Sequence, residues 1–182
     1  SVFARRGYVA GEARLRAEAF LRAWTDPSVA GVVAVRGGYG SVHILPWLVR
    51  EQILATPKVF VGYSDLTSLL TWLTLGCGLV SFHGPMLDRR LSRGDAGYDR
   101  RSFLDCVTKA EAVGELSCSD LSVLKSGVAS GPVYGGTLTQ IAASLGTPYA
   151  FQPSSPYVLF LEDQGERPYR LTVQALQEVD QL

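Results

Sequence analysis

The stretch Val59–Leu70, VFVGYSDLTSLL, decides the fold, because a strand pattern changes into a helix pattern within a single turn. The β-forming residues before Gly62 predict a strand, and the apolar spacing after Ser64 predicts an amphipathic helix. A sharp turn between two such elements pushes Ser64 out of the sheet edge, beside a helix N-terminus. This is the geometry of a nucleophile elbow, in which a serine hydroxyl is exposed for chemistry.

Local sequence leaves two interpretations of Ser64 open. As a nucleophile it needs a base to take its proton, and the backbone N–H of Asp65, free at the helix start, would stabilise an oxyanion. Alternatively, Ser64 or Asp65 is only the N-cap of the helix. The complete G-x-S-x-G pattern is not met, because Leu66 follows Asp65.

The segments around this turn alternate between strand and helix patterns. Val29–Val35 is a run of β-branched residues and alanine, typical of a parallel strand that is buried on both faces. Helices are predicted over Glu12–Trp24 and Ile44–Leu54, and a short strand over Leu79–Phe82. This order predicts an α/β fold, with an open, mainly parallel sheet and flanking helices.

A stretch rich in Ser and Gly over residues 116–131 is the predicted domain boundary. We place an α/β nucleophile domain at residues 1–120, and we expect its first strand to precede the first residue given. Residues 121–182 would start a smaller, β-rich C-terminal domain that is incomplete in this sequence. Within it, Tyr157–Leu161 is a predicted strand and Tyr169–Val179 a predicted helix.

Composition excludes several classes of protein. Hydrophobic residues make up 47% of the 182 residues, and 17 basic residues balance 17 acidic ones. This is a globular composition, with no basic surplus for binding nucleic acid or an anionic membrane. No apolar run reaches the roughly 18 to 20 residues that span a bilayer. The three cysteines form no C-x-x-C pair, which favours reduced thiols in the cytoplasm over a disulfide framework or zinc site.

The segment Arg36–Ser41, RGGYGS, directly follows a predicted strand, and we call it the glycine loop. Its glycines can present backbone N–H groups to an anion, or they can simply form a tight turn. The G-x-G-x-x-G frame that starts at Gly38 ends on His43, so the nucleotide-binding motif is not met. Because ligands bind beyond the carboxyl ends of parallel strands, we expect the glycine loop and Ser64 to face one crevice.

A pair of carboxylates, Glu162-Asp163, ends the last predicted strand. Such a pair can orient a base or bind a cationic substrate group, and it can equally be a solvated strand end or a helix cap. Only two histidines are present, His43 and His83, and neither has a partner at metal-ligand spacing. We predict that each is a packed or surface histidine, and we expect no metal and no cofactor.

Taken together, several segments resemble the LD-carboxypeptidase family of serine peptidases, which includes muramoyltetrapeptide carboxypeptidases and microcin C self-immunity proteins. The matching segments are Arg36–Ser41 (RGGYGS), Gly62–Thr67 (GYSDLT), Phe82–Leu87 (FHGPML), Gly135–Leu138 (GGTL), Ser144–Pro148 (SLGTP) and Leu161–Arg170 (LEDQGERPYR). Any one of these is a weak signal, but their shared order and spacing are highly specific.

The resemblance implies an α/β nucleophile domain followed by a smaller β-rich domain. It also implies metal-free hydrolysis of the bond between an L-centre and a C-terminal D-residue. The family's nucleophilic serine falls on Ser64, and its charge-relay glutamate falls on Glu162. Its oxyanion donors fall on the backbone N–H of Asp65 and on one N–H of the Gly37-Gly38 turn. Arg36 either contacts a substrate carboxylate or braces its own loop.

The family's catalytic histidine lies well downstream of Glu162, and this sequence contains no such position before Leu182. We therefore expect the 182 residues to be inactive alone. The expected parent is a cytoplasmic carboxypeptidase that cleaves a small murein-tetrapeptide-like peptide in cell-wall recycling. Alternatives are a self-immunity hydrolase for a peptide-nucleotide antibiotic and a non-catalytic fragment that binds a small ligand. Family members commonly form homodimers, so a homodimer is the assembly that the resemblance suggests.

Overall fold

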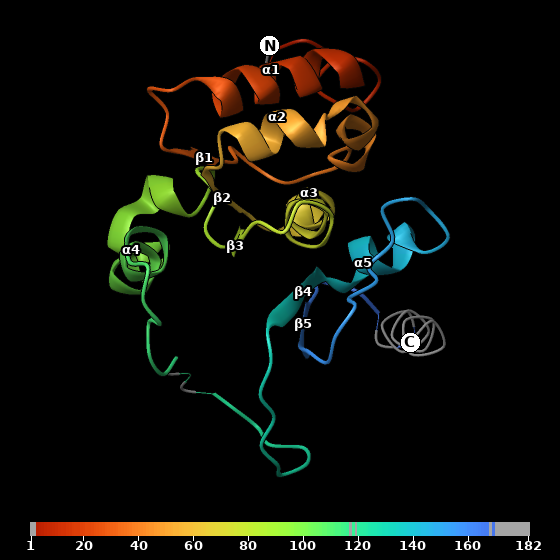
Figure 1. Ribbon diagram of the computed structural model, residues 1–182. Helices are drawn as coiled ribbons and strands as arrows, with labels where there is room; N and C mark the ends of the chain where they lie inside the picture. The colour runs from red at the N-terminus through yellow and green to blue at the C-terminus, as the bar shows by residue number, and fades with distance from the viewer. Residues whose placement is uncertain (1–2, 117, 119, 168, 170–182) are drawn as a thin grey trace.

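The computed structural model describes residues 3–116, 118, 120–167 and 169 (Figure 1). Its strands are β1 (Gly31–Val33), β2 (Val59–Gly62), β3 (Phe82–His83), β4 (Val133–Thr137) and β5 (Val158–Glu162). Its α-helices are α1 (Ala13–Thr25), α2 (Arg50–Ala55), α3 (Thr67–Thr71), α4 (Arg100–Thr108) and α5 (Leu138–Ser144). Helical segments of 3₁₀ type are η1 (Val42–Trp47), η2 (Ser64–Leu66) and η4 (Leu91–Ala96), and η3 (Trp72–Gly76) is of π type.

All strand pairs of the two sheets are parallel, which confirms the predicted α/β fold. The first sheet has the order β1-β2-β3, and the second pairs β4 with β5. In Figure 1, α1 and α2 lie together over β1 and β2, and α5 follows β4 at the other end of the molecule. The described residues between α4 and β4 form no helix or strand, and the domain boundary near residue 120 stays a prediction.

Strand β1 is shorter and more exposed than the continuous apolar run of its sequence predicts. Val33 is 40% exposed and Val35 is 51% exposed, so the expectation of a strand buried on both faces is wrong. Exposure alternates along β1 and the residues after it: Val32 packs against the core, whereas Val33 and Val35 face solvent, so only one face of the strand is covered.

The helix predicted over residues 44–54 is two separate segments. The 3₁₀ segment η1 contains Pro46 and ends at Trp47; the next residue, Leu48, has extended backbone (φ −90°, ψ 133°), and α2 begins only at Arg50. Proline lacks the N–H that an α-helix needs and clashes with the carbonyl four residues earlier, so a tighter segment and a break replace the continuous helix.

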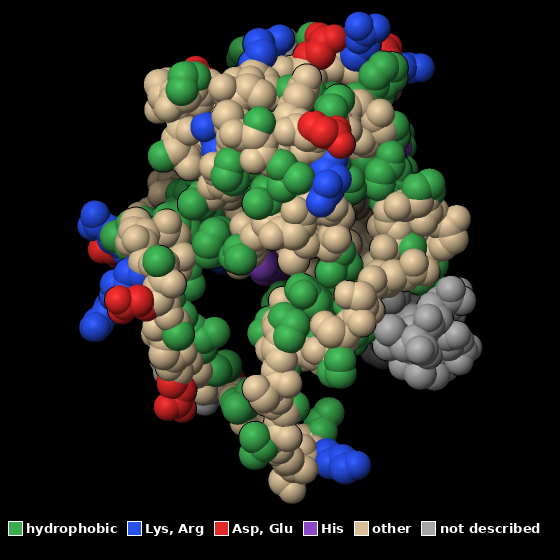
Figure 2. Space-filling view, viewed as in Figure 1, with side chains coloured by type: hydrophobic (Ala, Val, Ile, Leu, Met, Phe, Trp, Pro, Cys, Tyr) green, Lys and Arg blue, Asp and Glu red, His purple; other side chains and the backbone are tan. Residues whose placement is uncertain are grey.

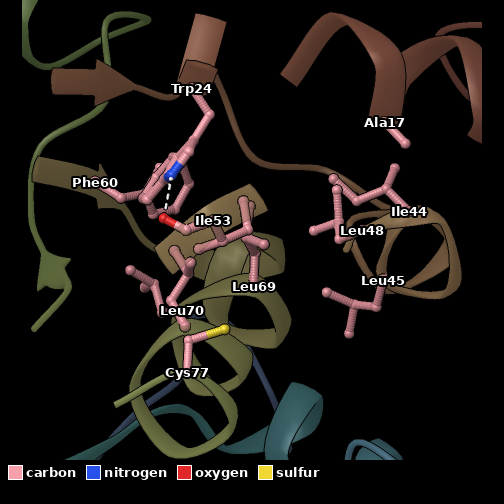
Figure 3. Packing of buried hydrophobic residues seen from close by; sticks show 11 residues of the cluster. Ala17, Trp24, Ile44, Leu45, Leu48, Ile53, Phe60, Leu69, Leu70 and Cys77 are labelled. Carbon is pink, nitrogen blue, oxygen red and sulfur yellow. Dashed lines mark hydrogen bonds between the residues drawn. The ribbon is translucent and has the colours of Figure 1, made fainter. Parts of the chain in front are cut away.

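The hydrophobic core joins α1, α2 and α3 to β2 (Figure 3). Trp24 and Ile53 are fully buried, and the Trp24 indole Nε1 donates a hydrogen bond of 3.0 Å to the Ile53 carbonyl oxygen. Phe60 of β2 and Leu69 of α3 pack into the same cluster. Burying each such side chain contributes about 1.5–3 kcal/mol, so both the strand before Ser64 and the helix after it are firmly held.

The second sheet docks against the start of α3. Thr67 Oγ1 accepts a hydrogen bond of 3.1 Å from the Thr137 backbone N–H, at the end of β4. A Cβ atom on Gly136 would lie 2.6 Å from Thr67 Cγ2, so only glycine allows this approach. The sequence pattern does not predict β4, because its glycines weaken the strand signal.

Two expectations concern the termini and membranes. The final helix predicted over Tyr169–Val179 lies almost wholly outside the described residues. Across the part of the chain that the structure describes, no helix has the length and apolar character needed to span a bilayer.

Candidate active site

Ser64 lies at the turn between β2 and the helical segment η2, in a strained conformation. Its φ is +60°, a left-handed value that non-glycine residues rarely adopt and that is found at functional sites. The helices that start here have Tyr63 and Leu66 as N-cap residues, without side-chain cap hydrogen bonds. The alternative in which Ser64 or Asp65 caps the helix is therefore wrong.

The glycine loop lies directly against Ser64, as the sheet-edge rule predicts. A Cβ atom on Gly37 would lie 3.1 Å from both Cβ and Oγ of Ser64, so the loop backbone borders the hydroxyl. Gly38 follows with φ +132°, which favours glycine. The N–H of Asp65 is at the second position of η2, where a helical N–H has no intrahelical acceptor.

The Asp65 side chain is buried, with 6% of the residue exposed, and it points into the glycine loop. Its Oδ1 accepts from the Gly40 N–H at 3.1 Å, and its Oδ2 accepts from the Ser41 N–H at 2.9 Å. Burial raises the pKa of the Asp65 carboxyl, against the lowering effect of these hydrogen bonds and of the Arg16 charge. The carboxylate therefore joins the serine turn to the loop.

Arg36 and Arg16 contribute differently to the glycine loop. The Arg36 guanidinium is exposed and makes no hydrogen bond or ion pair with other described residues. Arg16 of α1 instead donates from Nη1 to the Gly40 carbonyl oxygen at 2.7 Å. Bracing the loop is thus a task of Arg16, which sequence reasoning missed because it lies 24 residues away on a helix.

The two acids at the end of β5 have separate partners. Glu162 lies opposite Thr137 in the ladder, and the Thr137 hydroxyl donates to Glu162 Oε1. Asp163 Oδ2 accepts from both the backbone N–H and the hydroxyl of Thr139, at 3.1 and 2.7 Å, near the start of α5. Asp163 is thus a helix cap, whereas Glu162 faces β4 and the first sheet.

His83, at the end of β3, lies beside Glu162. Its Nε2 is 3.9 Å from Glu162 Oε1, and its side chain is 27% exposed. The imidazole also contacts the rings of Tyr63 and Phe160, with centroids 5.9 and 5.0 Å away. Burial lowers the pKa of His83, and the Glu162 charge opposes this shift. His83 is thus an exposed residue whose ring packs against Tyr63 and Phe160, and its contact with Glu162 was not predicted.

A largely apolar cavity of about 540 Å³, lined in part by His83, lies between α3, α4 and the second sheet. Figure 2 shows a hollow between the α4 segment and the β4–β5 pair. Neither Ser64 nor Gly37 lines the cavity, so the cavity is separate from the contact between the serine turn and the glycine loop. Within the described ranges, no group of three or more His, Cys, Asp or Glu side chains could hold a metal ion.

The carboxyl ends of both sheets thus meet at the start of α3. They gather a strained serine, an orphan backbone N–H, a glycine loop and a hydrogen-bonded carboxylate. Such groups can attack a carbonyl carbon and stabilise the oxyanion that forms. The fold places the chain among α/β proteins, and the geometry marks the Ser64 turn, at the edge of the sheet, as its candidate active site.

Comparison with known proteins identifies the family. The sequence pattern of the LD-carboxypeptidase N-terminal domain matches residues 1–84, and that of the LD-carboxypeptidase C-terminal domain matches residues 130–180. The chain belongs to the LD-carboxypeptidase family, which confirms the resemblance seen in the sequence.

Named relatives agree with this assignment. The chain is 33% identical over 166 residues to the probable murein peptide carboxypeptidase of Bacillus subtilis (strain 168), covering 91% of this chain and 52% of the relative. It is 25% identical over 185 residues to the microcin C7 self-immunity protein MccF of Escherichia coli, covering 86% and 53%. The crystal structure of muramoyltetrapeptide carboxypeptidase from Oxalobacter formigenes matches with a TM-score of 0.82 and 33% identity, covering 98% of this chain and 60% of that structure. The chain spans about half the length of the curated relatives it matches.

Proposed function

We propose that this chain carries the nucleophile, the oxyanion donors and the acidic residue of a Ser-Glu-His LD-carboxypeptidase. The substrate would be a murein tetrapeptide, cleaved between its L-centre and its C-terminal D-residue. The observation that carries this proposal is the strained Ser64 (φ +60°) with Gly37 packed against its side chain. The names of the Bacillus and Oxalobacter relatives support the class of substrate.

In the proposed reaction, Ser64 Oγ attacks the carbonyl carbon of the L,D bond, and a histidine takes the hydroxyl proton. The N–H groups of Asp65 and of Gly37 or Gly38 donate to the oxyanion of the tetrahedral intermediate. When the intermediate collapses, the C–N bond breaks and the histidine returns the proton to the leaving amine. Water then hydrolyses the acyl-serine ester, which frees Ser64 and the shortened peptide.

The base in this proposal is the family's histidine, from a part of the relatives' length that this chain does not span. Glu162, held by the Thr137 hydroxyl, would orient that imidazole. Arg36, exposed beside the glycine loop, would receive the terminal carboxylate of the substrate. The same family likeness supports three further parts of the proposal: inactivity of these 182 residues alone, a cytoplasmic location and a homodimer.

The test replaces the nucleophile in the intact protein. Ser64→Ala should lower the release of D-alanine from an L,D-linked tetrapeptide by more than about 10³-fold. Ser68→Ala is the matched control, because Ser68 lies farther along in α3 and contacts Gln140, at 3.3 Å between the side-chain oxygens. Full activity of Ser64→Ala would overturn the proposal.

A second candidate function follows from the likeness to MccF, a self-immunity protein by name. The same serine chemistry would then cleave a peptide-nucleotide antibiotic. Comparing kcat/KM for a murein tetrapeptide and for a peptide-nucleotide conjugate separates the two functions. We expect the murein tetrapeptide to be preferred, and a preference for the conjugate would favour self-immunity.

A further inference from the structure

The two proposed oxyanion donors belong to different segments of the chain. One is the N–H of Asp65 in the serine turn after β2, and the other lies in the glycine loop after β1. Donors stabilise an oxyanion only when both point at one place, within roughly 0.5 Å of the productive geometry. Something must therefore fix the loop to the turn, and the Asp65 side chain spans the two.

We propose that the Asp65 carboxylate is a positioning residue, which locks the glycine loop to the serine turn and so fixes the spacing of the two donors. This inference rests on the function proposed above. Its basis is three hydrogen bonds between one residue and the end of the loop. Asp65 accepts from the N–H groups of Gly40 and Ser41 at 3.1 and 2.9 Å, and the Ser41 hydroxyl donates back to the Asp65 carbonyl oxygen.

Arg16 completes the lock from the opposite side. It donates to the Gly40 carbonyl oxygen at 2.7 Å, so Asp65 holds the N–H of this glycine while Arg16 holds its C=O. The Arg16 charge also acts on the Asp65 carboxyl, which lies at 6% exposure. A carboxylate desolvated to this degree is costly unless it is hydrogen-bonded, and here the bonds all go to the loop.

A purely local role does not account for this side chain. Asp65 makes no N-cap hydrogen bond to the helix that it starts, since both of its carboxylate oxygens are directed at residues 24 and 25 positions earlier. Its removal therefore leaves the helix start intact and frees the loop. The expected defect lies in the transition state, where the donors are needed, rather than in the binding of substrate.

The experiment measures kcat and KM of Asp65→Asn in the intact protein. Asparagine keeps the size and one acceptor oxygen, but its NH₂ would face a backbone N–H. We expect kcat to fall about 10- to 100-fold with KM within about threefold, less than the 10²–10³-fold loss of a whole oxyanion donor. Asp26→Asn is the matched control, because Asp26 accepts from the Ser28 N–H and hydroxyl in an exposed turn.

A second variant keeps the test decisive if Asp65→Asn does not fold. Arg16→Met removes the donor to Gly40 and leaves Asp65 in place, and we expect kcat to fall about 3- to 10-fold. If the folded variants keep the wild-type kcat, or if only their KM changes, Asp65 does not position the oxyanion donors. If Ser64→Ala abolishes activity while these variants retain it, only this inference fails; if Ser64→Ala stays active, the proposed function itself fails.

Discussion

The serine and the glutamate of the proposed site are held in different ways. The region up to α4 contains the core cluster, in which Trp24 and Ile53 are fully buried (0% exposed) and Phe60 is 2% exposed. In the region that contains the second sheet, from β4 onward, Leu159 and Phe160 of β5 are 41% and 40% exposed. The Ser64 turn therefore rests on a packed sheet, whereas Glu162 stands at the end of a strand with little core beneath it.

The two halves of the proposed site are therefore held in place by different interactions. The serine turn and the glycine loop are locked within one region, through Asp65 and Arg16. Glu162 is linked to them across the joint between the two regions, by the Thr67–Thr137 hydrogen bond, where β4 docks on α3, and by its contact with His83. Substitutions at the serine turn or the glycine loop should lower kcat directly. Substitutions at the joint, where β4 docks on α3, should mainly lower the free energy of unfolding.

The largest effect is expected from Glu162→Gln, which removes the charge and keeps an acceptor for the Thr137 hydroxyl. In the intact protein we expect kcat to fall by about 10³–10⁴-fold, as when the acid of a serine triad is neutralised. Asp163→Asn is the control, because asparagine keeps an acceptor for the Thr139 N–H and caps a helix about as well as aspartate, so kcat and stability should change little. The reverse pattern would assign the acid role to Asp163.

A smaller loss is expected from Gly37→Ala. The new methyl group would lie 3.1 Å from Ser64 Oγ, so the hydroxyl or the loop must shift. Misplacement by about 1 Å costs on the order of 10²-fold in rate, which steady-state kinetics would detect. Gly127→Ala is the control and should leave the rate unchanged, because a Cβ atom there meets open space. Equal rates for both variants would show that Gly37 does not border the reacting groups.

At the joint, Thr67→Val should act mainly on stability. Valine has the same shape but cannot accept from the Thr137 N–H, which leaves this buried group unpaired at a cost of about 1–3 kcal/mol. Urea denaturation measures the change in the free energy of unfolding. Thr25→Val removes an exposed hydrogen bond to Leu21 and should cost less than about 0.5 kcal/mol. Similar costs for the two variants would mean that the joint contributes little.

The smallest expected effect is the contribution of His83 to the pH dependence of the free energy of unfolding. Burial lowers the folded-state pKa of His83 below its usual 6.5, so between these two values the unfolded chain binds more protons than the folded one. The stability that His83 contributes is therefore fully present above pH 6.5 and is lost as the pH falls through the folded-state pKa. Relative to His83→Gln, the wild-type free energy of unfolding should decline over this window. Parallel curves for the two proteins would contradict the lowered pKa of His83.

Sequence patterns predicted the parts of the site that follow strands. The turn at Ser64, the glycine loop and the acid pair each come directly after an apolar run, and parallel strands bring such segments to one edge. The patterns could not predict the bonds that lock these parts, since Arg16 and Thr137 lie 24 and 70 residues from their partners. They also missed the break at Leu48, which depends on Pro46, and the exposure of Val33, which lies on the uncovered face of β1.

The central claim is that Ser64 is an activated nucleophile. The most direct measurement treats the intact protein with a serine-directed organophosphonate and locates the adduct by mass spectrometry. We expect one adduct on the peptide that contains Ser64, absent in Ser64→Ala and present in Ser68→Ala. An adduct on another serine, or no adduct in a protein that still releases D-alanine from the L,D-linked tetrapeptide, would contradict it.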